Sequence, residues 1–210
     1  MIRIRYRATS CFSFRREQAT TKMAQTYFCP TPYAAKVALI VSGIRNELDP
    51  YELTKKMSKA NIIPHPWGEG VVNTHLVKHW EPPRSDTLPE DYIPDYFSST
   101  VVFREFLYFD GGVDLYVKPE IFDVIQPVVA GVNTLGKQGS FFVFEGIYKD
   151  VEPPKPSVTF SGSDFKDNAT WEKVSNFEGS NRKPRKDIEM GIALTMLGAS
   201  GDHIHYKFGG

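Results

Sequence analysis

The sequence lacks most of the features that mark membrane, metal-binding and disulfide-stabilised proteins. Only two of its 210 residues are cysteines, Cys11 and Cys29, and their spacing fits neither a metal site nor a disulfide framework. No run approaches the roughly 18 apolar residues of a membrane span. A secretory signal, a P-loop, a dinucleotide-binding fingerprint and a Ser-His-Asp signature are also missing. We therefore expect a cytoplasmic protein with no cofactor, no metal ion and no membrane contact.

Charge is unevenly distributed along a chain whose formal net charge is zero. Residues 1–45 contain eight lysines and arginines against one acid, Glu17, so this segment carries +7 and the other 165 residues sum to −7. A basic end on a neutral protein suits a partner that presents a ladder of negative charge, as a nucleic acid does.

The basic end begins with an expected strand, Ile2 to Thr9. Arginines at positions 3, 5 and 7 alternate with Ile2, Ile4 and Tyr6, which predicts one basic and one apolar strand face. An organellar transit peptide would instead have the period of an amphipathic helix. The loop that follows, residues 10–28, carries Arg15, Arg16 and Lys22.

A helix is expected from Pro32 to about Arg45. Thr31 suits its N-cap, and proline suits the first turn because its missing N–H is one of the unpaired ones there. Apolar residues recur at helical spacing and predict a stripe that faces the core. The members of this stripe are Ala34, Val37, Ala38, Val41 and Ile44.

Residues 47–100 have the composition of an insertion. A short helix, Pro50 to Lys59, follows the capping residue Asp49. Six prolines with interleaved tryptophan and tyrosine come next, a density that prevents a long helix and limits sheet pairing. Within this range Val71 to Trp80 is a candidate hairpin arm.

After the insertion, the pattern predicts strand, strand, helix, strand. Val101 to Phe109 and Val113 to Lys118 are expected to pair through a tight turn at Asp110-Gly111-Gly112. A helix starts at Pro119 and is expected to kink or split at Pro127. The last strand is Phe141 to Tyr148.

Without the insertion, the order strand, helix, strand, strand, helix, strand predicts an α+β, ferredoxin-like (RRM-like) domain over residues 1–150. A proline-rich linker then leads to a C-terminal extension, residues 151–210. In this extension, Ile188 to Leu197 is expected to be a helix or a buried segment.

Two groups of residues could carry chemistry. The glycine loop of residues 136–140 can bring backbone N–H groups close to a phosphate, although a plain turn before a core strand would use the same residues. Histidines four apart, His75 and His79, lie beside Lys78 and are the best candidates for metal-independent acid–base chemistry. On a strand they lie too far apart to share a metal ion.

Several motifs resemble those of the CRISPR-associated "Cas five" family, part of the repeat-associated RNA-binding (RAMP) superfamily. The resemblance covers about residues 1–148 and rests on the order of short motifs: Phe14-Arg15-Arg16, Thr26-Tyr27, Pro30 to Leu39, Arg104 to Leu107 with Val113 to Val117, and Leu135-Gly136. Phe28-Cys29 departs from the family, in which proline often follows the tyrosine sooner.

The resemblance implies a non-catalytic subunit of a type I CRISPR Cascade complex. Such a subunit binds the 5′ handle of the guide RNA (crRNA), contacts the large subunit and the backbone (Cas seven-type) subunits, and lies near target DNA at the complex foot. The insertion would be the thumb that kinks the guide. The candidate RNA contacts are Arg15, Arg16, Lys22, Tyr27, Tyr33, Lys36, Gly136, Lys137, Gln138, Gly139 and Ser140.

Two alternatives remain open at this point. One branch of the family cuts the precursor crRNA with Tyr, Lys and His groups, and the candidates for that role here are His75, Lys78 and His79. A ferredoxin-like scaffold without RNA is the third class, against which the +7 segment argues.

Overall fold

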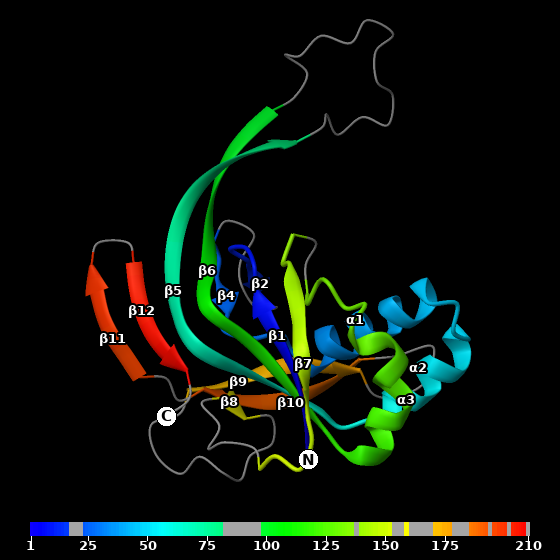
Figure 1. Cartoon of the computed structure of the whole chain (residues 1–210). Helices are drawn as coiled ribbons and strands as arrows, with labels where there is room; N and C mark the ends of the chain where they lie inside the picture. Colours follow the sequence, from blue (N-terminus) through cyan, green and yellow to red (C-terminus); the bar gives the residue numbers. More distant parts are fainter. Residues whose placement is uncertain are drawn as a thin grey trace, which may run out of the picture.

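The computed structural model describes residues 1–16, 23–81, 98–136, 139–152 and five segments of the C-terminal part. Those five are residues 158–159, 170–177, 185–192, 195–200 and 203–208. A large, mostly antiparallel sheet runs through the molecule, helices pack on one of its faces, and two strands extend from the body as a curved arm (Figure 1). None of the described helices is both long and apolar enough to cross a membrane.

The centre of the sheet has the ferredoxin-like arrangement. Its elements follow in chain order as β1 (Ile2–Ala8), α1 (Pro32–Arg45), β5 (Ile62–Glu81), β6 (Ser98–Val117), α3 (Pro119–Val129) and β7 (Phe142–Tyr148). The strand order is β5-β6-β1-β7, and each neighbouring pair is antiparallel. This order and the two crossover helices confirm the predicted fold class.

The predicted hairpin at Asp110-Gly111-Gly112 is wrong. β6 is one continuous strand, and it pairs with β5 without a break from Ile62↔Val117 to Glu81↔Ser98. Gly111 lies opposite Gly68 with positive φ at both positions, and a Cβ on either glycine would stand 2.2 Å from a carbonyl oxygen of the other strand. The glycines therefore allow the backbones of two strands to approach closely inside a long ribbon. In the sequence, the same glycine pair looks like the signal for a tight turn.

The range predicted as an insertion, residues 47–100, contains ordinary elements of the fold. α2 (Pro50–Lys59) packs against α1, and β5 is the second strand of the ferredoxin-like sheet. Only the far halves of β5 and β6 extend beyond the body (Figure 1). We call this two-stranded ribbon, residues 71–81 and 98–109, the arm; residues 82–97 lie outside the described part of the chain.

The described segments of the C-terminal part form strands, so the predicted helix is wrong, and Ile188 of the predicted segment packs partly buried against the core. β12 (His203–Phe208) pairs with residues 68–73 of β5, and β11 (Thr195–Ser200) pairs with β12, so both extend the main sheet. A second sheet contains β8 (Val158–Thr159), β9 (Thr170–Phe177) and β10 (Arg185–Ile192), and β9 packs against α1. Residues 188–197 span the end of β10 and the start of β11.

The predicted helix caps are confirmed. The hydroxyl oxygen of Thr31 accepts a hydrogen bond from the Ala34 N–H at 3.2 Å, and the Asp49 carboxylate accepts one from the Tyr51 N–H at 2.9 Å. These acceptors satisfy N–H groups that the first turn leaves unpaired.

The predicted apolar stripe of α1 is wrong in its orientation. Val41 and Ile44 are 38% and 49% exposed, whereas Ala35 and Leu39 are fully buried. α1 is apolar on nearly all sides, so the 3.6-residue period fits more than one stripe, and packing against the sheet, α3 and β9 selects the buried one.

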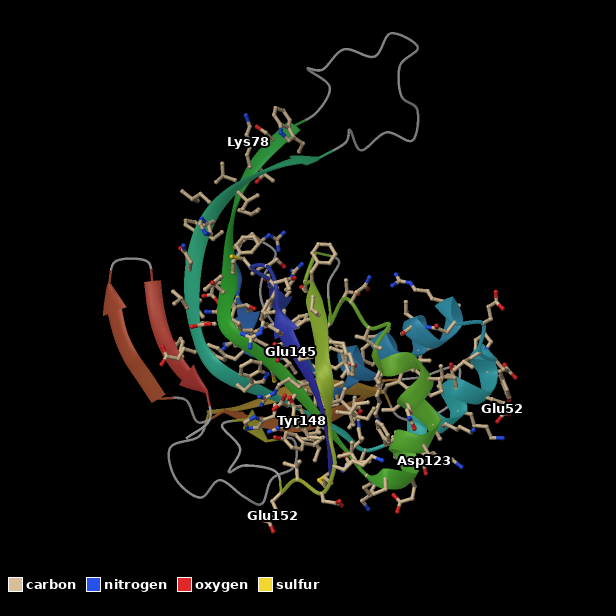
Figure 2. All side chains as sticks on the ribbon, viewed as in Figure 1. Glu52, Lys78, Asp123, Glu145, Tyr148 and Glu152 are labelled. Atoms are coloured by element: carbon tan, nitrogen blue, oxygen red, sulfur yellow. The ribbon has the colours of Figure 1, made fainter. Side chains whose placement is uncertain are left out.

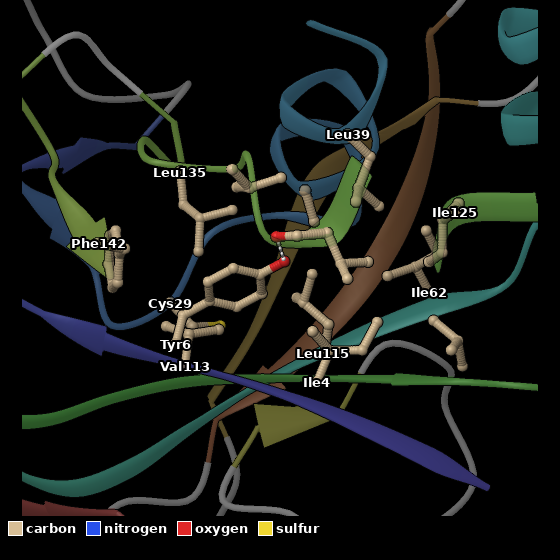
Figure 3. Close-up of a cluster of buried hydrophobic side chains, with 14 of the residues drawn as sticks. Ile4, Tyr6, Cys29, Leu39, Ile62, Val113, Leu115, Ile125, Leu135 and Phe142 are labelled. Carbon is tan, nitrogen blue, oxygen red and sulfur yellow. Dashed lines mark hydrogen bonds between the residues drawn. The ribbon is translucent and has the colours of Figure 1, made fainter. Parts of the chain in front are cut away.

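The core lies between the sheet and the helices (Figure 3). Ile4 and Tyr6 of β1 are completely buried, and the Tyr6 hydroxyl donates a hydrogen bond to the Val129 carbonyl at the end of α3, at 2.8 Å. The Ser42 hydroxyl of α1 donates to the neighbouring Val128 carbonyl at 2.7 Å. The two carbonyls also accept the backbone N–H groups of Gly131 and Val132, and the side-chain bonds fix the end of α3 to β1 and to α1.

The contact between Gly68 and Gly111 predicts a position-specific stability loss. We expect Gly68→Ala to lower the free energy of unfolding by about 3 kcal/mol, because positive φ and a backbone clash add together. Gly139→Ala is the matched control, since Gly139 also has positive φ but no atom within 4 Å of its Cβ position; it should cost about 1–2 kcal/mol. Urea denaturation measures both, and equal losses would contradict the close-approach explanation.

Candidate nucleic-acid interface

The Arg-bearing segment, residues 10–16 and 23–28, packs along the root of the arm. β2 (Phe14–Arg15) pairs with β4 (Thr26–Tyr27), and β3 (Met23–Ala24) pairs in parallel with residues 103–104 of β6. Phe12 exchanges two backbone hydrogen bonds with Leu107, and the Thr26 N–H donates to the Glu105 carboxylate at 2.9 Å. These contacts hold the basic segment against β6.

The glycine loop lies next to the same segment. The Ser10 hydroxyl donates to the Gly139 carbonyl at 3.1 Å and accepts from the Phe141 N–H at 3.3 Å. Gly136 has φ +91°, and a Cβ there would stand 2.6 Å from the Phe14 ring. Two stretches that are about 120 residues apart in the sequence therefore meet at one end of β1.

The predicted contact residues differ in accessibility. Arg15 is exposed, and Arg16 is half-buried, with one guanidinium N–H donating to Gln25 at 3.3 Å and the group 5.9 Å from the Tyr27 ring centre. Gly139 is exposed, with open space where a side chain would start. Lys22, Lys137 and Gln138 lie outside the described residues.

Burial removes three of the predicted contacts from the candidate site. Lys36 is 1% exposed, and its ammonium group donates to the Phe177 carbonyl of β9 at 2.9 Å. Tyr27 and Ser140 are also buried. The sequence places Lys36 in a basic segment, but it does not show that β9, about 140 residues later, packs against α1. Tyr33 is half-buried against the Phe177 ring.

The candidate acid–base residues lie on the arm and are not brought together. His75 and His79 are four residues apart in β5, so their backbones lie about 13 Å apart at roughly 3.3 Å per residue, and Lys78 lies on the face opposite His75. Lys78 is exposed near the far end of the arm, 4.4 Å from the Trp80 ring centre (Figure 2). Within the described ranges, no group of three or more His, Cys, Asp and Glu residues is arranged to hold a metal ion.

The basic face of β1 is the feature whose partners the sequence did not reveal. Arg5 donates two hydrogen bonds to Asp114 of β6, at 2.8 and 2.7 Å, and Asp114 is 2% exposed. This contact raises the pKa of the Arg5 guanidinium above its usual value. A bulge in β7 leaves Glu145 with no residue opposite it in β1, between the pairs Arg5↔Gly146 and Tyr6↔Phe144. The Glu145 carboxylate accepts a hydrogen bond from Arg7.

His65 lies beside Asp114 on the same face. It is almost fully buried, and this burial lowers its pKa despite the nearby carboxylate. The Tyr116 ring meets the His65 ring edge to face, and burial raises the pKa of the Tyr116 phenol. These groups form a polar layer beneath the arginines of β1.

A cavity of about 550 Å³ lies away from these basic residues, between α1, α2 and β9. Its lining includes Val37, Ile40, Tyr51 and Phe177 and is mainly apolar. We assign it no part in the candidate interface.

Comparison with known proteins gives one curated relative with significant similarity. The chain is 25% identical over 152 residues to a "CRISPR-associated protein Cas5" from Archaeoglobus fulgidus. The match covers 71% of this chain and 64% of the relative, so the chain spans less than two thirds of that protein's length. This similarity confirms the resemblance inferred from the sequence motifs. No protein-family model matches the chain.

Two solved structures match nearly the whole chain with TM-scores below 0.5. One is a CRISPR protein from Archaeoglobus fulgidus, with a TM-score of 0.45 and 12% identity over 100% of this chain and 92% of that one. Another is a chain of the type III-B Cmr-beta complex bound to cognate target RNA and AMPPnP, with a TM-score of 0.48, 13% identity and coverage of 97% and 86%. The fold assignment above rests on this chain's own strand order.

The two acids that pair with the arginines of β1, Asp114 and Glu145, predict unequal effects on stability. We expect Asp114→Asn to lower the free energy of unfolding by about 2 kcal/mol, because it replaces a buried carboxylate that accepts two charged hydrogen bonds. Glu145→Gln, which weakens the more exposed pair with Arg7, should change it by less than about 1 kcal/mol. Urea denaturation of both variants measures the difference, and a larger loss in Glu145→Gln would contradict this ranking.

Proposed function

We propose that this chain, which resembles a CRISPR-associated protein Cas5, is a non-catalytic subunit that binds guide RNA in a CRISPR effector complex. The observation that carries the proposal is the meeting of the Arg-bearing segment and the glycine loop beside the root of the arm. Both segments were candidate RNA contacts on separate grounds, and the fold brings them to one place.

Each part of this site has a chemical role in the proposal. Arg15 and Arg16 would neutralise phosphates, and the exposed backbone at Gly139 would let a nucleotide approach closely. Lys22, Lys137 and Gln138, which lie outside the described residues, stay candidate contacts in the proposal. Arginine side chains on one segment and exposed glycine backbone on its neighbour suit a phosphodiester better than a neutral ligand.

The arm supports a role inside an assembly. Several of its large apolar side chains are exposed: Leu76, Trp80, Val101, Phe103 and Tyr108. A two-stranded ribbon gains little by displaying them to water, so they suit a partner surface. In the proposal the arm is the thumb that kinks the guide, and it contacts neighbouring protein subunits.

The finer assignment follows the same proposal. The RNA held at the root of the arm would be the 5′ handle of the crRNA, in a type I Cascade complex. The large subunit and the first Cas seven-type backbone subunit would be the protein neighbours, with target DNA close to the complex foot. The domain division at residue 150 also remains a proposal. Two strands from beyond that residue, β11 and β12, are part of the main sheet.

The Arg-bearing segment and the glycine loop, which we together call the loop site, predict a specific change in the salt dependence of RNA binding. We expect Arg15→Ala/Arg16→Ala to weaken crRNA binding and to reduce the slope of log K against log salt by up to about two units, because each arginine neutralises at most about one phosphate. Lys55→Ala/Lys56→Ala on exposed α2 removes the same charge elsewhere and serves as the control. Fluorescence anisotropy over a salt series measures the slopes. An unchanged slope in the folded arginine variant would reject the assignment.

A second prediction concerns catalysis. We expect no defined cut when the purified protein is incubated with its own repeat RNA in chelator, because acid–base cleavage needs groups that converge on one 2′-hydroxyl. The strand keeps His75 far from His79 and directs Lys78 to the other face. A single cut that disappears in His75→Ala or His79→Ala would establish the endoribonuclease alternative instead.

A further inference from the structure

The face of the main sheet opposite the helices carries a stack of arginine and aromatic side chains. Arg3 lies 4.2 Å from the Tyr148 ring centre, and Arg5 lies 5.9 Å from the same centre. Arg5 and Arg7 lie 4.3 and 5.0 Å from the Trp67 ring centre. Three guanidinium groups therefore alternate with two rings in the order Arg3, Tyr148, Arg5, Trp67, Arg7. We call this set the guanidinium–aromatic ladder.

Two glycines make room for the ladder. Gly112 of β6 lies between Arg7 and Trp67 in register, so no side chain separates them. Gly146 of β7 lies opposite Arg5, and a Cβ there would stand 3.7 Å from the Tyr148 ring, so this ring lies over the glycine. The rings can therefore rest on the sheet and meet arginines of β1 from both sides. Tyr148 and Glu145 are labelled on β7 in Figure 2.

We propose that the guanidinium–aromatic ladder is a binding platform for single-stranded nucleic acid, separate from the loop site. A base would stack on the outer plane of a terminal guanidinium or take the place of an arginine on a ring face, and phosphates would contact the guanidinium N–H groups. Such stacking tolerates any base, since every base has a π-face.

Accessibility and charge favour this occupant over a protein surface. Tyr148 is 41% exposed and the Arg7 side chain 49% exposed, whereas the Arg3 and Arg5 side chains are 22% and 23% exposed and Trp67 is half-buried. Arg7 and Tyr148 are therefore the members of the ladder that face solvent most. Three arginines face two carboxylates, those of Asp114 and Glu145, and Asp114 lies buried beneath the arginines. The outer surface is therefore cationic and aromatic, a combination that matches a strand of stacked bases and phosphates.

The ladder also lies close to the loop site along β1. Arg7 is two residues before Thr9, whose backbone N–H donates to the Phe141 carbonyl at 3.1 Å, directly after the glycine loop. A single strand could pass from one site to the other, but the ladder has its own contacts and does not depend on the loop site.

Tryptophan fluorescence can test the platform directly. The double variant Trp80→Phe/Trp171→Phe leaves Trp67 as the only tryptophan. In this background, we expect a short oligouridylate to quench Trp67 saturably, whereas an abasic phosphodiester strand of equal length should not. Tyr148→Leu should weaken the oligouridylate affinity about tenfold or more, because it removes one stacking surface. Tyr148→Phe should keep the affinity, and Tyr51→Ala on α2 is the control for loss of an exposed tyrosine.

The same measurement separates the ladder from the loop site. Adding Arg15→Ala/Arg16→Ala should leave the Trp67 quench in place, even if these changes abolish binding at the loop. The platform is overturned if anisotropy shows oligouridylate bound without any Trp67 quench. Equal quenching by the abasic strand, or an unchanged affinity in a folded Tyr148→Leu variant, would also overturn it.

Discussion

The unbroken pairing of β5 with β6 is the constraint on which the rest of the structure depends. Its inner half, from Ile62↔Val117, supplies two strands of the ferredoxin-like sheet, and its outer half forms the arm. β12 adds to β5 only between residues 68 and 73, while β3 and Phe12 attach to β6. The close approach of Gly68 and Gly111 lies between the two halves. The register of β5 with β6 therefore positions the body, the arm and the Arg-bearing segment.

β1 serves both sides of this sheet. Its core face packs Ile4 and Tyr6 under α1 and α3, and the Tyr6 hydroxyl reaches the end of α3. Its other face presents arginines whose charge is partly neutralised by Asp114 and Glu145. A strand with this alternation joins a hydrophobic core to a cationic surface with no intervening loop. The platform that we propose on this face therefore rests on a central strand of the sheet.

The basic N-terminal segment is used in three different ways. The arginines of β1 stack with aromatic rings, and Arg15 and Arg16 lie on a segment attached to the arm. Lys36 is buried and donates a hydrogen bond to the Phe177 carbonyl. A net charge of +7 does not distinguish these uses, because each depends on which distant strand lies opposite. For Lys36 that strand is β9, and for Arg5 it is β6.

Local chemistry determined what the sequence could predict. The caps at Thr31 and Asp49 and the alternation of β1 need only nearby residues, so β1, α1 and α2 were predictable. The ferredoxin-like class was also predicted correctly, although the prediction divided β6 into two strands and placed β5 in an insertion. Tertiary pairing decided the rest. Asp110-Gly111-Gly112 has the composition of a turn, but its backbone is held extended by Gly68 and its neighbours. Val41 and Ile44 have core periodicity but lie outside, because the sheet and β9 cover another side of α1. Residues such as Trp67, Gly146 and Tyr148 meet the β1 arginines only through register, which local sequence does not encode.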